Sequence, residues 1–109
     1  LTMEKIAKIA RESLPDFDAQ IIVVHHSQKK DKPSGTAKRI GELTGIKEIH
    51  SLRGGDTPGI HTVIMSGNGE EMVITHRSYN KSVFARGALQ AAQKLLTKAP
   101  GLYAAENLL

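Results

Sequence analysis

The chain has 109 residues, which is enough for one globular domain and too few for two ordinary ones. Hydrophobic residues make up 39% and charged residues 24%, with both signs of charge mixed along the sequence, a composition that argues against a disordered chain. Without cysteine there is no disulfide framework and no thiolate metal site, which is compatible with the cytoplasm. The longest apolar run, IIVV, is far shorter than a membrane span. We expect one cytoplasmic domain that has no membrane partner.

The net charge of +4 fits an anionic ligand, a nucleic acid or an ordinary basic surface. Aromatic residues are only 4% of the chain and no basic stripe follows a predicted helix, which argues against a nucleic-acid partner. The opening segment, LTMEKIAKIARESL, begins directly in a helical pattern. We therefore expect the chain to be a piece of a longer protein.

The first half of the chain begins with a predicted helix and strand. Residues 2–14 repeat apolar side chains at intervals of three and four, and Pro15 follows, so the pattern predicts a helix. Residues 16–26 predict a strand, in which the continuously apolar run 21–24 is typical of a central strand with both faces covered. The polar residues 27–33 predict a loop.

Two further helices are predicted. One lies between Ser34, whose side chain can cap its N-terminus, and Gly45, which can end it. The other lies within residues 81–101, where apolar residues recur at helical spacing. In this last helix Gly87 and several alanines should allow a close approach to a sheet.

Three β-rich segments, 47–55, 59–67 and 70–78, lie between these helices. The last two should form a hairpin, since Asn68–Gly69 suits a tight turn. The element order predicts an α+β fold, a single open mixed sheet of about four strands with helices packed on one face. Because the other face and the sheet edges then need cover, we expect a homo-oligomer that forms through the open face.

Two histidines and three lysines follow the first predicted strand. Successive side chains of a strand point to opposite faces, so His25 and His26 cannot both bind one metal there. An imidazole suits proton transfer, but either histidine could equally be structural. Lys29, Lys30 and Lys32 then form a basic loop, which alone would most often be a solvated turn.

The predicted helix start beside this loop favours an anion. Backbone N–H groups of Ser34, Gly35 and Thr36 lie at a helix N-terminus, where unpaired donors and the helix dipole attract negative charge. Gly35 has no side chain to block the approach, and the Ser34 and Thr36 hydroxyls add two donors. With the charge of Lys29, these groups predict a pocket for a small carboxylate or phosphate beside a proton donor. No P-loop and no dinucleotide-binding glycine motif occurs in the sequence.

Three more histidines, His50, His61 and His76, lie on predicted strands. Their spacing is not that of metal ligands, so we predict structural roles for them and no metal site.

The segment 25–37, HHSQKKDKPSGTA, resembles the signature of the 4-hydroxy-tetrahydrodipicolinate reductase (dihydrodipicolinate reductase) family. The later segments SLRGGDTPGIHTV, EEMVITHRSYNKSVFARGALQAAQKLL and PGLY resemble the C-terminal domain of that family in the same order. The resemblance therefore covers nearly the whole chain. It implies that residues 1–109 form a single substrate-binding and tetramerisation domain, and that the N-terminal Rossmann domain of the family is absent from this chain.

The resemblance also implies an activity and a set of site residues. The family reduces 4-hydroxy-tetrahydrodipicolinate in lysine and diaminopimelate biosynthesis, with NADH or NADPH bound mainly by the absent domain, so this domain should be inactive alone. By position, His25 corresponds to a proton donor or acceptor and Lys29 to a proton donor. A second group of positions holds the carboxylate of the dicarboxylate substrate: His26, Ser34, Gly35 and Thr36.

Two positions depart from the pattern of the family. Val23 stands where many members carry a glutamate, and Lys81 stands where many carry an arginine that faces the cleft of cofactor and substrate. Lysine keeps the positive charge but loses the bidentate geometry of arginine. These departures leave open an alternative function, a non-catalytic anion-binding or assembly module of the same fold.

Overall fold

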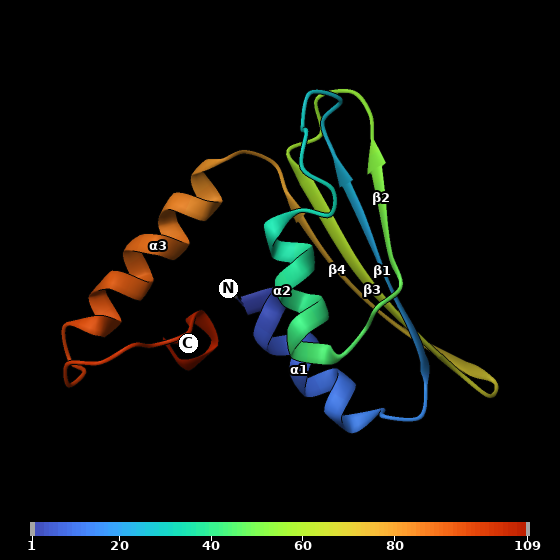
Figure 1. Ribbon diagram of the computed structural model, residues 1–109, viewed down its shortest axis with the longest axis horizontal. Coiled ribbons are helices and arrows are strands. Elements are labelled where there is room, and N and C mark those ends of the chain that lie inside the picture. The colour runs from blue at the N-terminus through green and yellow to red at the C-terminus, as the bar shows by residue number, and fades with distance from the viewer. Residues whose placement is uncertain (1, 109) are drawn as a thin grey trace.

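The computed structural model describes residues 2–108. The elements in chain order are α1 (Thr2–Ser13), β1 (Asp18–His25), α2 (Gly35–Thr44), β2 (Ile49–Arg53), β3 (Gly59–Gly67), β4 (Glu70–Ser78), α3 (Ser82–Leu95) and the short 3-10 helix η1 (Ala105–Leu108). This order confirms the predicted α+β class, with each of the predicted helices and strands in place (Figure 1). No helix within the described residues is long and apolar enough to cross a membrane.

The four strands form one mixed sheet in the order β2-β1-β3-β4. β1 and β2 are parallel, and α2 makes the crossover that such a pair requires. β3 is antiparallel to both β1 and β4, and the turn that joins β3 to β4 contains Gly69 at a φ of 78°. In this register Val23 lies opposite His61, and His61 lies opposite His76.

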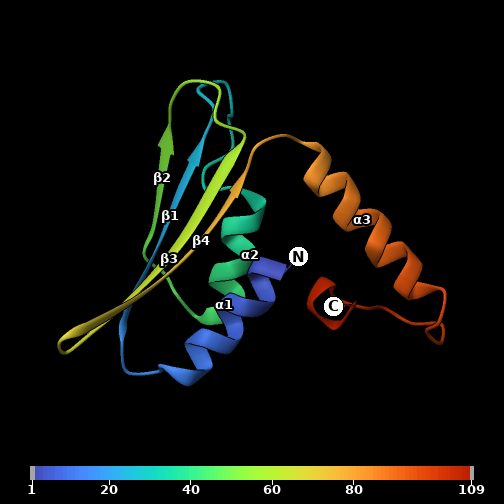
Figure 2. The ribbon, with the colours of Figure 1, turned by 180° about the vertical axis from the view of Figure 1, so that it is seen from behind.

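One face of the sheet carries the core. α1 and α2 lie on that face, while no described element lies on the opposite face (Figures 1 and 2). The residues of the core cluster are Met3, Ala7, Ile21, Val23, Ala37, Ile40, Ile46, Val63 and Met65. Because side chains alternate along a strand, Ile22 and Val24 point away from the helices and are only half-buried. The sequence predicted that both faces of β1 are covered, but the described residues of this chain cover only one of them.

The last helix stands apart from the sheet. None of the side chains of α3 is buried, and in both views its ribbon lies beyond α1 and α2 (Figures 1 and 2). The predicted close approach around Gly87 to the sheet is therefore wrong. The physical reason is that α1 and α2 already occupy the core face.

Candidate functional site

The polar residues gather at one end of the sheet. β1 ends at His25, β2 ends at Arg53 and β4 ends at Ser78, while the antiparallel β3 begins at Gly59. The parallel and antiparallel pairings bring these four positions to the same end, and the loop after His25 leads directly into α2. The histidine pair, the lysine loop and the α2 N-terminus consequently share one end of the sheet.

His25 is packed against backbone at this end. Its side chain is buried, and its Nδ1 has no hydrogen-bond partner among the described residues. A Cβ atom at Gly59 would lie 3.2 Å from His25 Nε2, so glycine makes room for the ring. Burial lowers the pKa of His25, and the positive charges of Lys29 and Arg53 lower it further. The ring is therefore neutral near neutral pH.

Arg53 and Asp31 hold the lysine loop in place. Lys29 Nζ lies 3.0 Å from Asp31 Oδ1, and this hydrogen bond lowers the pKa of Asp31. Arg53 donates to the backbone oxygen of Lys29 at 3.3 Å and to that of Asp31. Lys29 is half-buried, whereas Lys30 and Lys32 are exposed. The structure thus separates Lys29 from the other two lysines as the one whose charge reaches His25.

The start of α2 has the predicted cap. Ser34 Oγ accepts a hydrogen bond from the backbone N–H of Ala37 at 3.2 Å, and Ser34 has the extended backbone of an N-cap. The Ser34 side chain is buried and also lies 3.1 Å from His61 Nε2, so it faces inward, unlike the predicted outward donor. Gly35 is exposed, with no atom within 4 Å of the place a Cβ would take. An approach to the backbone N–H groups of Gly35 and Thr36 is therefore open.

His61 belongs to the site, although the sequence pattern favoured a purely structural role. It is only 2% exposed, and its ring meets that of His25 edge to face, with centroids 5.2 Å apart and an interplanar angle of 77°. Burial, together with the charges of His25, His76 and Lys29, lowers the pKa of His61 from 6.5 to about 4. The available sequence signal was the alternation in β3, which puts His61 on the same face as the buried Val63.

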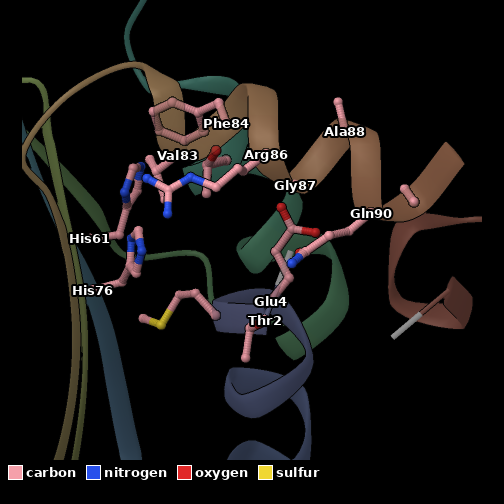
Figure 3. A pocket seen from close by; sticks show the side chains of 13 residues that line it. Thr2, Glu4, His61, His76, Val83, Phe84, Arg86, Gly87, Ala88 and Gln90 are labelled. Carbon is pink, nitrogen blue, oxygen red and sulfur yellow. The ribbon is translucent and has the colours of Figure 1, made fainter. Parts of the chain in front are cut away.

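A cavity of about 440 Å³ adjoins these residues (Figure 3). Thr36 and His61 line it at the α2 start, and Arg86 extends from α3 toward His61 and His76 in the close view (Figure 3). The rest of the lining comes from His76 on β4, from the first residues of α1 and from α3. Of the predicted site residues only Thr36 lines the cavity, and Lys81 is exposed at the N-terminus of α3.

The remaining predicted residue, His26, is half-buried at the start of the lysine loop. Among the side chains that the structure describes, no three of histidine, aspartate or glutamate are grouped as metal ligands would be. What the arrangement offers is a neutral imidazole, one lysine ammonium and an open helix N-terminus. Such a site can bind a carboxylate and move a proton close to it.

Known proteins are similar to this chain in sequence and fold. The family model described as "Dihydrodipicolinate reductase, C-terminus" matches residues 1–109. The 4-hydroxy-tetrahydrodipicolinate reductase of Thermosipho africanus is 48% identical over 92% of this chain and 46% of its own length. That of Methanosarcina acetivorans is 40% identical over 96% of this chain and 48% of its own length. The chain thus spans about half the length of these relatives.

The fold is also that of a solved structure. A dipicolinate-bound dihydrodipicolinate reductase from Paenisporosarcina sp. TG-14 superimposes with a TM-score of 0.86 at 27% identity. The match covers 99% of this chain and 50% of that protein.

Proposed function

The chain belongs to the family of dihydrodipicolinate reductase C-terminal domains, and we propose that it is the substrate-binding and oligomerisation domain of a cytoplasmic reductase. That reductase would act on 4-hydroxy-tetrahydrodipicolinate in lysine and diaminopimelate biosynthesis. One observation carries the proposal. His25, Lys29 and the open N-terminus of α2 lie at the same end of the sheet, although β1 and α2 are separated by a loop in the sequence.

The substrate carboxylate would bind at the start of α2. Gly35 and Thr36 offer backbone N–H groups there, and the helix dipole favours negative charge. Lys29 would supply a cation, with His26 beside it on the same loop. The carboxylate of Asp31, which now accepts from Lys29, is more than half exposed, and ion pairs of that kind contribute little free energy. A substrate carboxylate can therefore replace Asp31 at the lysine.

The proposed reaction requires that a proton be delivered to one particular carbon of the substrate. Overall, the substrate loses its hydroxyl and one hydrogen of an adjacent carbon as water, and one hydride and one proton are added to neighbouring carbons. NADH or NADPH supplies the hydride. We assign the proton delivery to Lys29, whereas the buried and neutral His25 is suited to accept a proton. This chain has no glycine-rich dinucleotide motif, so the nicotinamide cofactor would be held mainly by a Rossmann domain outside it.

The site assignment is tested by calorimetry with dipicolinate on the reductase that carries this domain. Lys29→Ala removes a charge-assisted hydrogen bond to a carboxylate and should raise the dissociation constant by roughly 10-fold to 100-fold. Lys30→Ala is the matched control, because it removes the same charge from an exposed position next to Lys29. Equal affinities of the Lys29→Ala protein and the wild type would contradict the assignment.

A second candidate function is the non-catalytic anion-binding or assembly module. The observation that favours it is the pair of departures at Val23 and Lys81, since Val23 offers no carboxylate to the buried His61 opposite it and lysine lacks the bidentate geometry of arginine. Fusion of the chain to a nucleotide-binding domain of the family, followed by an assay of NAD(P)H oxidation, separates the two functions. A correctly folded fusion protein that binds dipicolinate without turnover would favour the module.

The oligomer that we propose, a homotetramer, would form through the uncovered face of the sheet. Apolar and β-branched side chains from all four strands lie on that face: Ile22, Val24, Leu52, Ile60, Thr62, Ile64, Val73 and Thr75. Apolar sheet faces of this kind are usually buried against another element or another subunit.

A further inference from the structure

His61 is the feature of the site that the proposed chemistry leaves unused. It is 2% exposed, so water barely reaches it, and it lies between two residues with proposed roles. On one side its ring packs edge to face on His25, and on the other its Nε2 lies 3.1 Å from Ser34 Oγ. Burying a polar side chain costs free energy unless the side chain is hydrogen-bonded, and the contact with Ser34 gives His61 such a partner.

The Ser34 hydroxyl has limited bonding capacity. It holds one O–H donor and two lone pairs, and one lone pair already accepts the N–H of Ala37 at 3.2 Å. The contact with His61 Nε2 uses the remaining donor or the second lone pair. With both bonds made, the hydroxyl cannot rotate without breaking one of them. Ser34 is thereby locked in the conformation that begins α2.

The position of Ser34 matters for the residues that follow it. Gly35 and Thr36, whose backbone N–H groups point out of the helix start, come directly after the cap, and Thr36 lines the same cavity as His61. A cap that can rotate lets the first turn fray, and the N–H groups then no longer converge on one point. Preorganised donors bind an anion more tightly than mobile ones, because no ordering is required on binding.

We propose that His61 is a positioning residue: it locks Ser34 and thereby the anion-binding first turn of α2, and it holds the His25 ring beside that turn. The inference rests on the proposed function, since it deepens the role of the same site. His61 sets the affinity for the carboxylate without bonding to it. A purely structural histidine would affect folding stability alone.

The test compares variants of the reductase that carries this domain, with dipicolinate affinity by calorimetry and thermal unfolding measured on each. His61→Leu keeps the volume but removes the bond to Ser34, and it should raise the dissociation constant about tenfold. His61→Gln should restore the affinity to near the wild-type value, because its amide reaches about as far as imidazole Nε2.

A matched control lies at the other end of the same helix. Thr44 is also buried, and its hydroxyl donates to the Ile40 oxygen at 2.6 Å and accepts from the Ile46 N–H at 3.3 Å. Thr44→Val should lower the melting temperature as His61→Leu does but leave the dipicolinate affinity unchanged. If both variants weaken binding equally, the effect is general destabilisation and the positioning role is overturned.

Coupling to Ser34 gives an independent readout. In a Ser34→Ala background, His61→Leu should cause a much smaller loss of affinity than it does in the wild type, because its partner hydroxyl is already gone. Additive losses would overturn the inference. If His61→Leu does not fold, His61→Asn takes its place, since that amide is too short to reach Ser34. Wild-type protein that fails to bind dipicolinate would overturn the proposed function as well, whereas wild-type binding with unchanged His61 variants overturns the positioning role alone.

Discussion

At the scale of single residues, His61 gives the fold a dependence on pH. Its pKa is about 4 in the folded chain, against an ordinary value of 6.5. Between these two values the unfolded chain binds a proton that the folded chain excludes. The free energy of unfolding therefore keeps its full contribution from His61 above pH 6.5 and loses it as the pH falls toward 4, by about 1.4 kcal/mol for each pH unit and about 3 kcal/mol in total.

A His61→Gln protein should lack this part of the acid sensitivity. We expect its urea-unfolding free energy to fall less steeply than that of the wild type between pH 6.5 and pH 4. Thr44→Val is the control, because it adds no titrating group and should lower the free energy by a similar amount at every pH. Parallel curves for wild type and His61→Gln would show that His61 is not buried in its neutral form.

The sequence predicted the common location of neighbouring residues better than that of distant ones. His25, Lys29 and Ser34 lie within one short segment, so their common location follows from the order of strand, loop and helix. His61 is far along the chain, and only the register of β1 with β3 puts it opposite Val23 and beside His25. The same register explains what the departure at Val23 removes. A carboxylate at that position would face His61, whereas valine leaves the imidazole with an apolar neighbour on β1 and His76 on β4.

At the scale of elements, α2 is the part of the site that the sequence specified most fully. Ser34 caps its start and Gly45, at a φ of 73°, ends it, as the pattern predicted. Both signals act locally on the backbone, so no knowledge of the tertiary fold was needed. For α3 the local pattern was equally helical, but its packing partner was not encoded locally. Small residues such as Gly87 permit a close approach without specifying to which surface.

A substitution at Gly35 separates helix stability from ligand binding. Alanine is the better helix former, and no atom lies within 4 Å of its new Cβ, so Gly35→Ala should leave stability unchanged or raise it by up to about 1 kcal/mol. The same methyl group projects into the approach to the α2 N-terminus and should weaken dipicolinate binding about tenfold by calorimetry.

Gly101→Ala is the control for that substitution. It adds a methyl group whose nearest neighbour is a Tyr103 ring atom at an ordinary 3.7 Å, in the segment between α3 and η1. Both thermal stability and dipicolinate affinity should stay close to those of the wild type. Undiminished binding by the Gly35→Ala protein would mean that the ligand does not approach α2 along its axis.

At the scale of the whole molecule, the described chain leaves two surfaces without a partner. One is α3, which carries apolar residues such as Phe84 and Leu89 on exposed positions. The other is the face of the sheet opposite α1 and α2 (Figure 2). The sequence indicated the second, because an open sheet with helices on one side must leave a face bare. It did not indicate the first, since helical periodicity predicts an apolar stripe but not what covers it.

A charge placed at the centre of the uncovered sheet face tests whether subunits assemble through that face. Thr62 is half-buried, lies opposite Ile22 on β1 and bonds through Oγ1 to Thr75 Oγ1 at 3.1 Å. In a single subunit the Thr62→Lys side chain can extend into water, so the fold should tolerate it. Between two apposed sheets the ammonium would be buried without a partner, which is strongly unfavourable.

We therefore expect Thr62→Lys to reduce the mass measured by light scattering to that of a smaller species. The control is Ser13→Lys, which adds the same charge at the exposed end of α1 and should keep the wild-type mass. Assembly unaffected by Thr62→Lys would assign the contacts between subunits to another surface, and the exposed side chains of α3 would then be the next to replace.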